Sequence, residues 1–169
     1  MSQGYIFETK RLGLRELTLS DQDDLGKILC DRDSMKYYKK VFLEEDVRDW
    51  ILRNINRYEK NGFGLWALIR KEDGMFLGDT GITIQNIDSE MLPEIGYHII
   101  PKYQRNGYAS EAALGCVKYA SEVLSIKRIY SYAWIKNIPS QNVMKKIGMK
   151  VFKMYRDDDQ ENIVYSIDI

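Results

Sequence analysis

The feature that most constrains the fold is residues 94–113, where a strand-like stretch leads through a short loop into a helix that opens at a glycine. The N–H groups in the first turn of a helix have no partners within the helix, and the helix dipole favours an anion there. Gly107 would let a phosphate approach the backbone closely because glycine has no side chain, and Ala109 keeps the first turn thin. Three nearby side chains add hydrogen-bond donors: Gln104, Arg105 and Ser110. The segment predicts a pyrophosphate-binding cradle, with an ordinary strand-to-helix connection as the alternative.

Hydrophobic periodicity predicts strands and helices along the rest of the chain. Strands are expected over about 11–17, 64–70, 75–84, 91–100, 128–135, 149–156 and 162–168. Helices are expected over about 20–30, 44–60, 108–124 and 139–147. Ser20 is the expected N-cap of the first helix, Asp73 and Gly74 are typical of a hairpin turn, and Gly148 is typical of a helix C-cap. This order predicts an α/β domain in which a central mixed sheet has helices on its faces.

Composition narrows the classes of function. The chain has 169 residues, which suits a single domain over 1–169, and we find no linker or repeat. It has 25 basic and 25 acidic residues, so binding of nucleic acid through bulk charge is not expected. A single histidine, His98, and two cysteines far apart, Cys30 and Cys116, predict no metal site. No apolar run is long enough to span a membrane and no signal-like segment opens the chain, so we expect a cytoplasmic protein without a membrane partner.

Four segments, in order along nearly the whole chain, carry a family resemblance. Residues 104–109 (QRNGYA) resemble the Q/R-x-x-G-x-G/A acetyl-CoA signature of the GNAT N-acetyltransferase superfamily. Residues 8–15 resemble the opening strand of its RimJ/RimL-like branch, the ribosomal-protein N-acetyltransferases. Residues 109–112 resemble the start of that branch's helix, and residues 137–149 resemble its N-x-x-S…L-G-F segment. The resemblance implies the GNAT fold: an α/β (α+β) domain with a mixed, mostly antiparallel sheet, splayed central strands and helices on both faces.

The resemblance also implies where acetyl-CoA, the co-substrate, would bind. Its pyrophosphate is expected on the backbone amides of Gln104, Arg105, Asn106, Gly107, Tyr108, Ala109 and Ser110. Its pantetheine arm is expected to run beside the 91–100 strand as an added strand, bonded to the backbone of Tyr97 and Ile99. Asn137 would reach the pantetheine from the other side, with Ser140 and Asn142 nearby. A strand amide would stabilise the charge that develops on the thioester oxygen.

The sequence indicates the groups that transfer protons less directly than it indicates the acetyl-CoA site. Many superfamily members place a tyrosine acid where this chain has Met144, so Ser140 or water is expected to protonate the thiolate, or no acid is needed. Tyr130, Tyr132 and Tyr165 are alternative donors, although each is more often a core or groove-lining aromatic. Glu94 is the best candidate for a base, with a surface or ion-paired carboxylate as the alternative. His98 is a second candidate, although a lone histidine in a strand is more often structural. By alternation Glu94, Gly96 and His98 are expected to share one strand face.

The expected activity is transfer of an acetyl group from acetyl-CoA to a primary amine by direct attack. The acceptor is left open among a protein N-terminus, an amino acid, a polyamine and a drug, and the acceptor groove is expected from residues of about 20–60 and 150–165. The basic run 36–40 (KYYKK) is either a solvated loop or part of the acceptor-binding rim. A non-catalytic acyl-CoA-binding sensor or scaffold is the alternative function. Oligomeric state is open, with a homodimer as one option.

Overall fold

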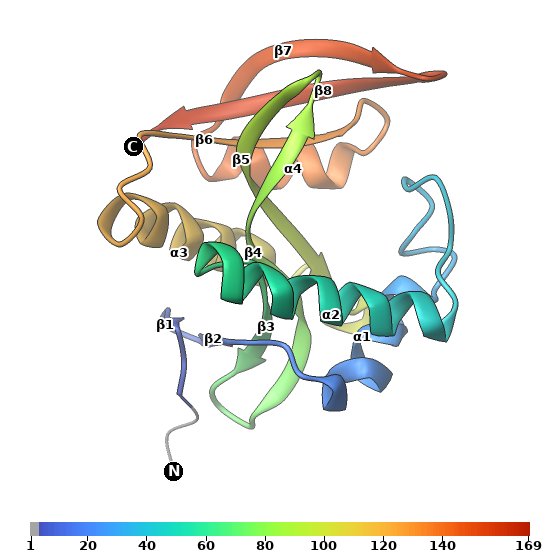
Figure 1. Ribbon diagram of the computed structural model, residues 1–169, viewed down its shortest axis with the longest axis vertical. Helices are drawn as coiled ribbons and strands as arrows, with labels where there is room; N and C mark the ends of the chain where they lie inside the picture. The colour runs from blue at the N-terminus through green and yellow to red at the C-terminus, as the bar shows by residue number, and fades with distance from the viewer. Residues whose placement is uncertain (1–3) are drawn as a thin grey trace.

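The strand-like segments assemble into one eight-stranded sheet in the computed structural model, which describes residues 4–169 (Figure 1). The strand order is β1-β2-β3-β4-β5-β6-β8-β7. The strands are β1 (Phe7–Glu8), β2 (Leu12–Arg15), β3 (Leu65–Arg70), β4 (Met75–Ile87), β5 (Glu90–Ile99), β6 (Arg128–Trp134), β7 (Lys150–Asp157) and β8 (Gln160–Asp168). The helices are α1 (Gln22–Leu29), α2 (Glu44–Asn61), α3 (Tyr108–Glu122) and α4 (Ile138–Lys146), with short 3-10 turns η1 (Leu19–Asp21) and η2 (Pro101–Tyr103).

All of the expected strands and helices are present, most with ends one or two residues from the expected bounds, and three further differences concern the N-cap of α1, the end of β4 and the short β1. Ser20 is not the N-cap of α1, because the chain enters this helix through η1, whose N-cap is Thr18. The Asp21 carboxylate accepts a hydrogen bond from the Thr18 N–H at 2.8 Å and pairs with Arg15 at 2.8 Å, which holds this tighter turn in place. Strand β4 extends three residues beyond the expected end at Ile84, to Ile87. Strand β1, only two residues long, carries too little pattern to be predicted.

The centre of the sheet is where its pairing changes. Strands β4 and β5 pair antiparallel over ten residues, from Gly78 with Ile99 to Ile87 with Glu90. Strands β5 and β6 are parallel and pair in register only at Glu94 with Tyr130, whereas every other strand pair is antiparallel. The sheet is therefore mixed and mostly antiparallel, and strands β5 and β6 splay apart near its centre. Figure 1 shows β6, β7 and β8 gathered at one end of the molecule, with β4 and β5 leading away from them.

Helices cover both faces of the sheet, and the alternation along β3 shows why. Trp66 and Leu68 point into a core that includes α3 and α4 residues, whereas Ala67 and Ile69 point into a second core built with α1 and α2. Both faces of this strand are buried, so it reads as a continuous apolar run. Beyond Tyr108 at its first position, the residues that α3 buries are small, which lets that helix lie close against the sheet: Ser110, Ala112, Ala113, Cys116 and Ala120. Within residues 4–169 no helix has the length and apolar character needed to cross a membrane.

Met144 provides a test of this packing. Its side chain has no exposed surface and lies in the core that α3 and α4 share. We expect Met144→Ala to lower the free energy of unfolding by about 2–5 kcal/mol, because a buried cavity replaces the side chain. Urea denaturation measures this loss, and Met154→Ala, at a position 48% exposed on β7, is the matched control with little expected effect. Turnover per folded molecule should hardly change, and a large loss of turnover at native stability would contradict a purely structural Met144.

Candidate active site

Helix α3 begins at a glycine whose backbone conformation other residues rarely adopt. Gly107, the N-cap of α3, has a φ of 78°, in the left-handed region. A Cβ at this position would meet only the Arg11 guanidinium, at 3.4 Å. Glycine is therefore favoured here by the backbone conformation and not by a lack of space. Arg105 also has a positive φ, 63°, so the chain turns sharply twice just before the helix.

A cavity of about 540 Å³ lies between this loop, β5 and the start of α4. Most of the residues expected to bind acetyl-CoA line it: Tyr97, Ile99, Gln104, Arg105, Gly107, Tyr108, Ala109, Ser110, Asn137 and Ser140. Asn106 and Asn142 do not line it. The Asn106 amide donates to the carbonyls of Tyr103 and Gln104, at 3.0 and 3.1 Å, within its own loop, and Asn142 is exposed on α4. This arrangement therefore gives no support to a binding role for the Asn106 and Asn142 side chains.

The strand edge that faces the splay is already partly hydrogen-bonded. The Gln104 amide Nε2 donates to the Ile99 carbonyl at 3.0 Å, and the Ser131 hydroxyl donates to the Ile95 carbonyl at 2.9 Å. Between these two carbonyls lies Tyr97, which also lines the cavity. A pantetheine amide could therefore bond to the Ile99 carbonyl only if it shared that carbonyl with Gln104 or displaced it.

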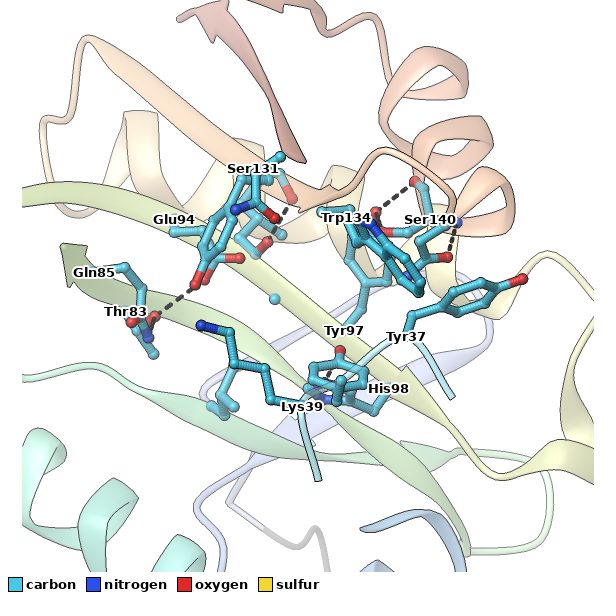
Figure 2. A pocket seen from close by; sticks show the side chains of 18 of the residues that line it. Tyr37, Lys39, Thr83, Gln85, Glu94, Tyr97, His98, Ser131, Trp134 and Ser140 are labelled. Carbon is cyan, nitrogen blue, oxygen red and sulfur yellow. Dashed lines mark hydrogen bonds between the residues drawn. The ribbon is translucent and has the colours of Figure 1, made fainter. Parts of the chain in front are cut away.

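A second cavity, of about 430 Å³, lies farther along β5 (Figure 2). It extends under α2 and the 36–42 segment to β6 and β8, and it contains Glu94. The two cavities meet, because six residues line both of them: Tyr37, Tyr38, Tyr97, His98, Asn137 and Ser140. Residues 37–40 of the basic run line the second cavity, which favours the rim interpretation of that run over a solvated loop.

Glu94 lies in the second cavity with little to stabilise its charge. Its Oε2 accepts one hydrogen bond, from the Thr83 hydroxyl at 3.3 Å, and Gln85 in turn donates to Thr83 at 3.0 Å (Figure 2). Burial raises the pKa of Glu94 to about 8, against the opposing effects of His98, Thr83 and Arg57. A Cβ added at Gly96 would lie 3.7 Å from Glu94 Oε2, so these two residues share one strand face as expected.

His98 is held at both of its ring nitrogens. Nδ1 lies 2.6 Å from Oδ1 of Asp79, its cross-strand neighbour, and Nε2 lies 2.7 Å from the Tyr38 hydroxyl. Asp79 is fully buried and also accepts a hydrogen bond from Trp50 Nε1 at 2.9 Å. Burial alone would lower the pKa of His98, but the attraction of the Asp79 carboxylate outweighs it and the pKa is raised. A histidine with both nitrogens engaged is less available as a base than Glu94.

Ser140 lies where the two cavities meet, in the first turn of α4. The Asn137 side-chain oxygen accepts a hydrogen bond from the Ser140 N–H at 3.2 Å and so caps this helix. The Tyr97 hydroxyl donates to the Ser140 carbonyl at 2.8 Å and lies 3.1 Å from the Ser140 hydroxyl. Met144, one turn later, lines neither cavity.

Sequence reasoning missed Asp79, Trp50 and Arg57. Asp79 is the only charged residue of the expected strand 75–84, a signal that could have indicated it, because a buried carboxylate needs a partner. Trp50 belongs to the apolar face that periodicity predicts for α2, but that pattern does not indicate that its Nε1 meets a carboxylate, and Arg57 lies outside the pattern. Residues 4–169 contain no group of three or more histidine, cysteine, aspartate or glutamate side chains placed to hold a metal ion.

Comparisons with known proteins show which family the chain belongs to. The acetyltransferase (GNAT) domain family matches residues 11–150. The uncharacterised N-acetyltransferase YnaD of Bacillus subtilis is 34% identical over 143 residues, which are 84% of this chain and 81% of YnaD. The crystal structure of a GNAT-family acetyltransferase from Bacillus anthracis superposes with a TM-score of 0.80 at 29% identity, over 95% of this chain and 96% of the other.

A ribosomal-protein acetyltransferase shares this fold. RimL, a ribosomal alpha-N-protein acetyltransferase whose structure holds coenzyme A, superposes with a TM-score of 0.78 over 98% of each chain, at 15% identity. At that identity the likeness concerns the fold. The family match over most of the chain and the 34% identity with YnaD show that this protein belongs to the GNAT acetyltransferases and is an acetyl-CoA-dependent N-acetyltransferase.

Proposed function

We propose that this enzyme transfers the acetyl group of acetyl-CoA directly to a primary amine, at the junction of its two cavities. The observation that carries the proposal is that the cavities are lined by different functional groups yet share residues on β5 and α4. One cavity is bordered by the glycine-opened α3, and the other contains a carboxyl group with a raised pKa, that of Glu94. We also propose that residues 1–169 act as one domain.

The first cavity fits acetyl-CoA. The pyrophosphate would bind the N–H groups of residues 104–110, where the left-handed Gly107 leaves no side chain between the backbone and a phosphate. The pantetheine would lie in the splay beside Tyr97 and Ile99, with Asn137 on the opposite wall. When bound, acetyl-CoA supplies an activated thioester at the junction.

Glu94 is the group best placed to take a proton from the acceptor. Amine acceptors have pKa values between ~8 for an α-amine and ~10.4 for lysine, so they are mostly protonated at pH 7. Glu94 in its carboxylate form, the minority form at pH 7 because its pKa is about 8, first takes one proton from the ammonium group, directly or through one water, and so frees the nitrogen lone pair. The nitrogen then bonds to the thioester carbon, the C–S bond breaks, and the second proton leaves the nitrogen to replace the one that the CoA sulfur takes up. The CoA sulfur takes a proton from the Ser140 hydroxyl or from water. Release of free CoA in the presence of an amine distinguishes this reaction from simple acyl-CoA binding.

The cofactor site can be tested through Gly107. Acetyl-CoA at a hundredfold excess over its Kd should stabilise the native protein by about 2.7 kcal/mol. Gly107→Val should abolish this stabilisation, because the left-handed turn is lost and a branched side chain enters the phosphate space. Gly74→Val is the matched control: Gly74 has a φ of 72° and open space around it, in the β3–β4 hairpin, so the backbone strain is similar but acetyl-CoA should still stabilise this variant. A native protein whose melting temperature is unchanged in millimolar acetyl-CoA would refute the proposed site.

The base can be tested through Glu94. Glu94→Gln should keep its affinity for acetyl-CoA but lose about 10²-fold in turnover at pH 7, a loss typical of a removed general base. The loss should shrink at high pH, where the acceptor amine deprotonates unaided. The matched control is Glu90→Gln, an exposed position on the same strand, which should keep normal turnover.

The pH dependence of the free energy of unfolding gives an independent measurement of the pKa of Glu94. Its pKa is about 8 in the folded protein against an ordinary 4.5, so the folded state holds this proton more tightly than the unfolded state. The free energy of unfolding of the native protein should therefore fall between about pH 4.5 and pH 8 relative to that of Glu94→Gln. Normal turnover by Glu94→Gln at pH 7 would mean that another group or bulk water takes the proton.

A further inference from the structure

Two arginines of α2 line the second cavity without a carboxylate partner. Arg53 and Arg57 are four residues apart, so they lie on one face of the helix. Arg57 Nη1 donates to the side-chain oxygen of Asn54 at 3.0 Å, and the Arg53 guanidinium lies 5.9 Å from the centre of the Trp50 ring. Within residues 4–169, neither arginine has an acidic oxygen within ion-pair distance.

The other charged groups of this cavity are compensated. Lys39 pairs with Asp157 and Asp158, at 3.2 and 2.8 Å, and Lys40 pairs with Asp46 at 3.1 Å. His98 pairs with the buried Asp79. The pKa of Glu94, about 8, leaves this carboxyl group mostly protonated at pH 7. Among the described residues, the two arginines are therefore the cations of this cavity that no ion pair compensates.

This arrangement is unfavourable in the absence of a ligand. Burial and the nearby Arg53 lower the pKa of Arg57 against the opposing attraction of Glu94, Tyr58 and Asp79, so its charged form is less stable there than in water. Like charges four residues apart on a helix also repel each other. A carboxylate relieves both effects, because a guanidinium presents a planar fork of donors that matches the two carboxylate oxygens.

Resting on the acetyltransferase function proposed above, we propose that the acceptor is an amine that also carries a carboxylate, and that Arg57, assisted by Arg53, binds that carboxylate. Glu94 and Arg57 line one cavity, so the amine would face Glu94 and the junction while the carboxylate faces α2. Aromatic side chains line the same cavity and suit an apolar part of the acceptor: Tyr37, Phe42, Trp50, Tyr132 and Trp134. A polyamine is disfavoured because its second cation would lie against the arginines.

A carboxylate near an amine can come from a free amino acid or from an acidic residue at a peptide N-terminus. Two matched pairs of probes separate these sources: phenylalanine with phenylalaninamide, and glutamyl-phenylalaninamide with glutaminyl-phenylalaninamide. The members of each pair differ only in whether one group is a carboxylate or an amide. Calorimetric titration in the presence of saturating CoA, which cannot react, measures each Kd without turnover.

We expect the carboxylate member of at least one pair to bind about tenfold or more tightly, as a charge-assisted hydrogen bond allows. Arg57→Gln should bring the two Kd values of that pair together with little effect on the amide member, and Arg57→Lys should restore part of the preference. Arg48→Gln is the matched control, since Arg48 is exposed on the same helix and lines neither cavity. Far-UV circular dichroism of Arg57→Gln confirms that its fold is intact before the titration.

Three results would overturn the inference: equal Kd values within both pairs, no binding of any probe at millimolar concentration, or a preference that survives in Arg57→Gln. Each of these leaves the transfer reaction itself untouched. The proposed function fails on a different measurement, namely when no free CoA is released from acetyl-CoA with a broad panel of amines. The two proposals therefore stand or fall separately.

Discussion

The active site depends on the point where strands β5 and β6 stop pairing. They are in register only at Glu94 with Tyr130, and beyond that pair the Ser131 hydroxyl takes the place of a backbone donor at the Ile95 carbonyl. A parallel pair that diverges leaves N–H and C=O groups inside a sheet without strand partners, and such groups favour an extended ligand. Both cavities open from this divergence, one toward α3 and one toward α2.

The local parts of this architecture could be predicted from the sequence because short-range patterns determine them. The opening of α3 at Gly107 and the hairpin at Gly74 each depend on a backbone conformation that glycine adopts easily, and both glycines have positive φ. The fold and family followed from motifs spread along the whole chain. Ser20 was wrongly predicted as an N-cap because an ion pair between Arg15 and Asp21 holds the chain in a 3-10 turn before α1. N-cap preferences describe only the residues next to a helix start, so they cannot predict a contact between residues six positions apart.

The chemistry of the site was less predictable, since it arises from contacts between distant segments. Asp79 and His98 become neighbours only through the register of β4 with β5, and the arginines of α2 face the cavity because the helix packs across the sheet. Hydrophobic periodicity predicts a buried face of α2 that includes Val47 and Ile51, which are buried, but it does not show what the other face of the helix meets. The raised pKa of Glu94 has the same origin, because burial in a cavity has no signature in the residues next to it in sequence.

The hydrogen-bonded chain from Trp50 through Asp79 and His98 to Tyr38 joins α2, β4 and β5 to the segment that carries Tyr37 and Tyr38. Those two tyrosines form part of the wall of both cavities. A ligand in either cavity that orders this shared wall makes the other cavity less costly to fill, since the ordering entropy is lost only once. Such coupling is reciprocal: whatever factor acetyl-CoA adds to the affinity for the acceptor, the acceptor adds to the affinity for acetyl-CoA. The common wall is thus the structural element through which each substrate could alter the affinity for the other.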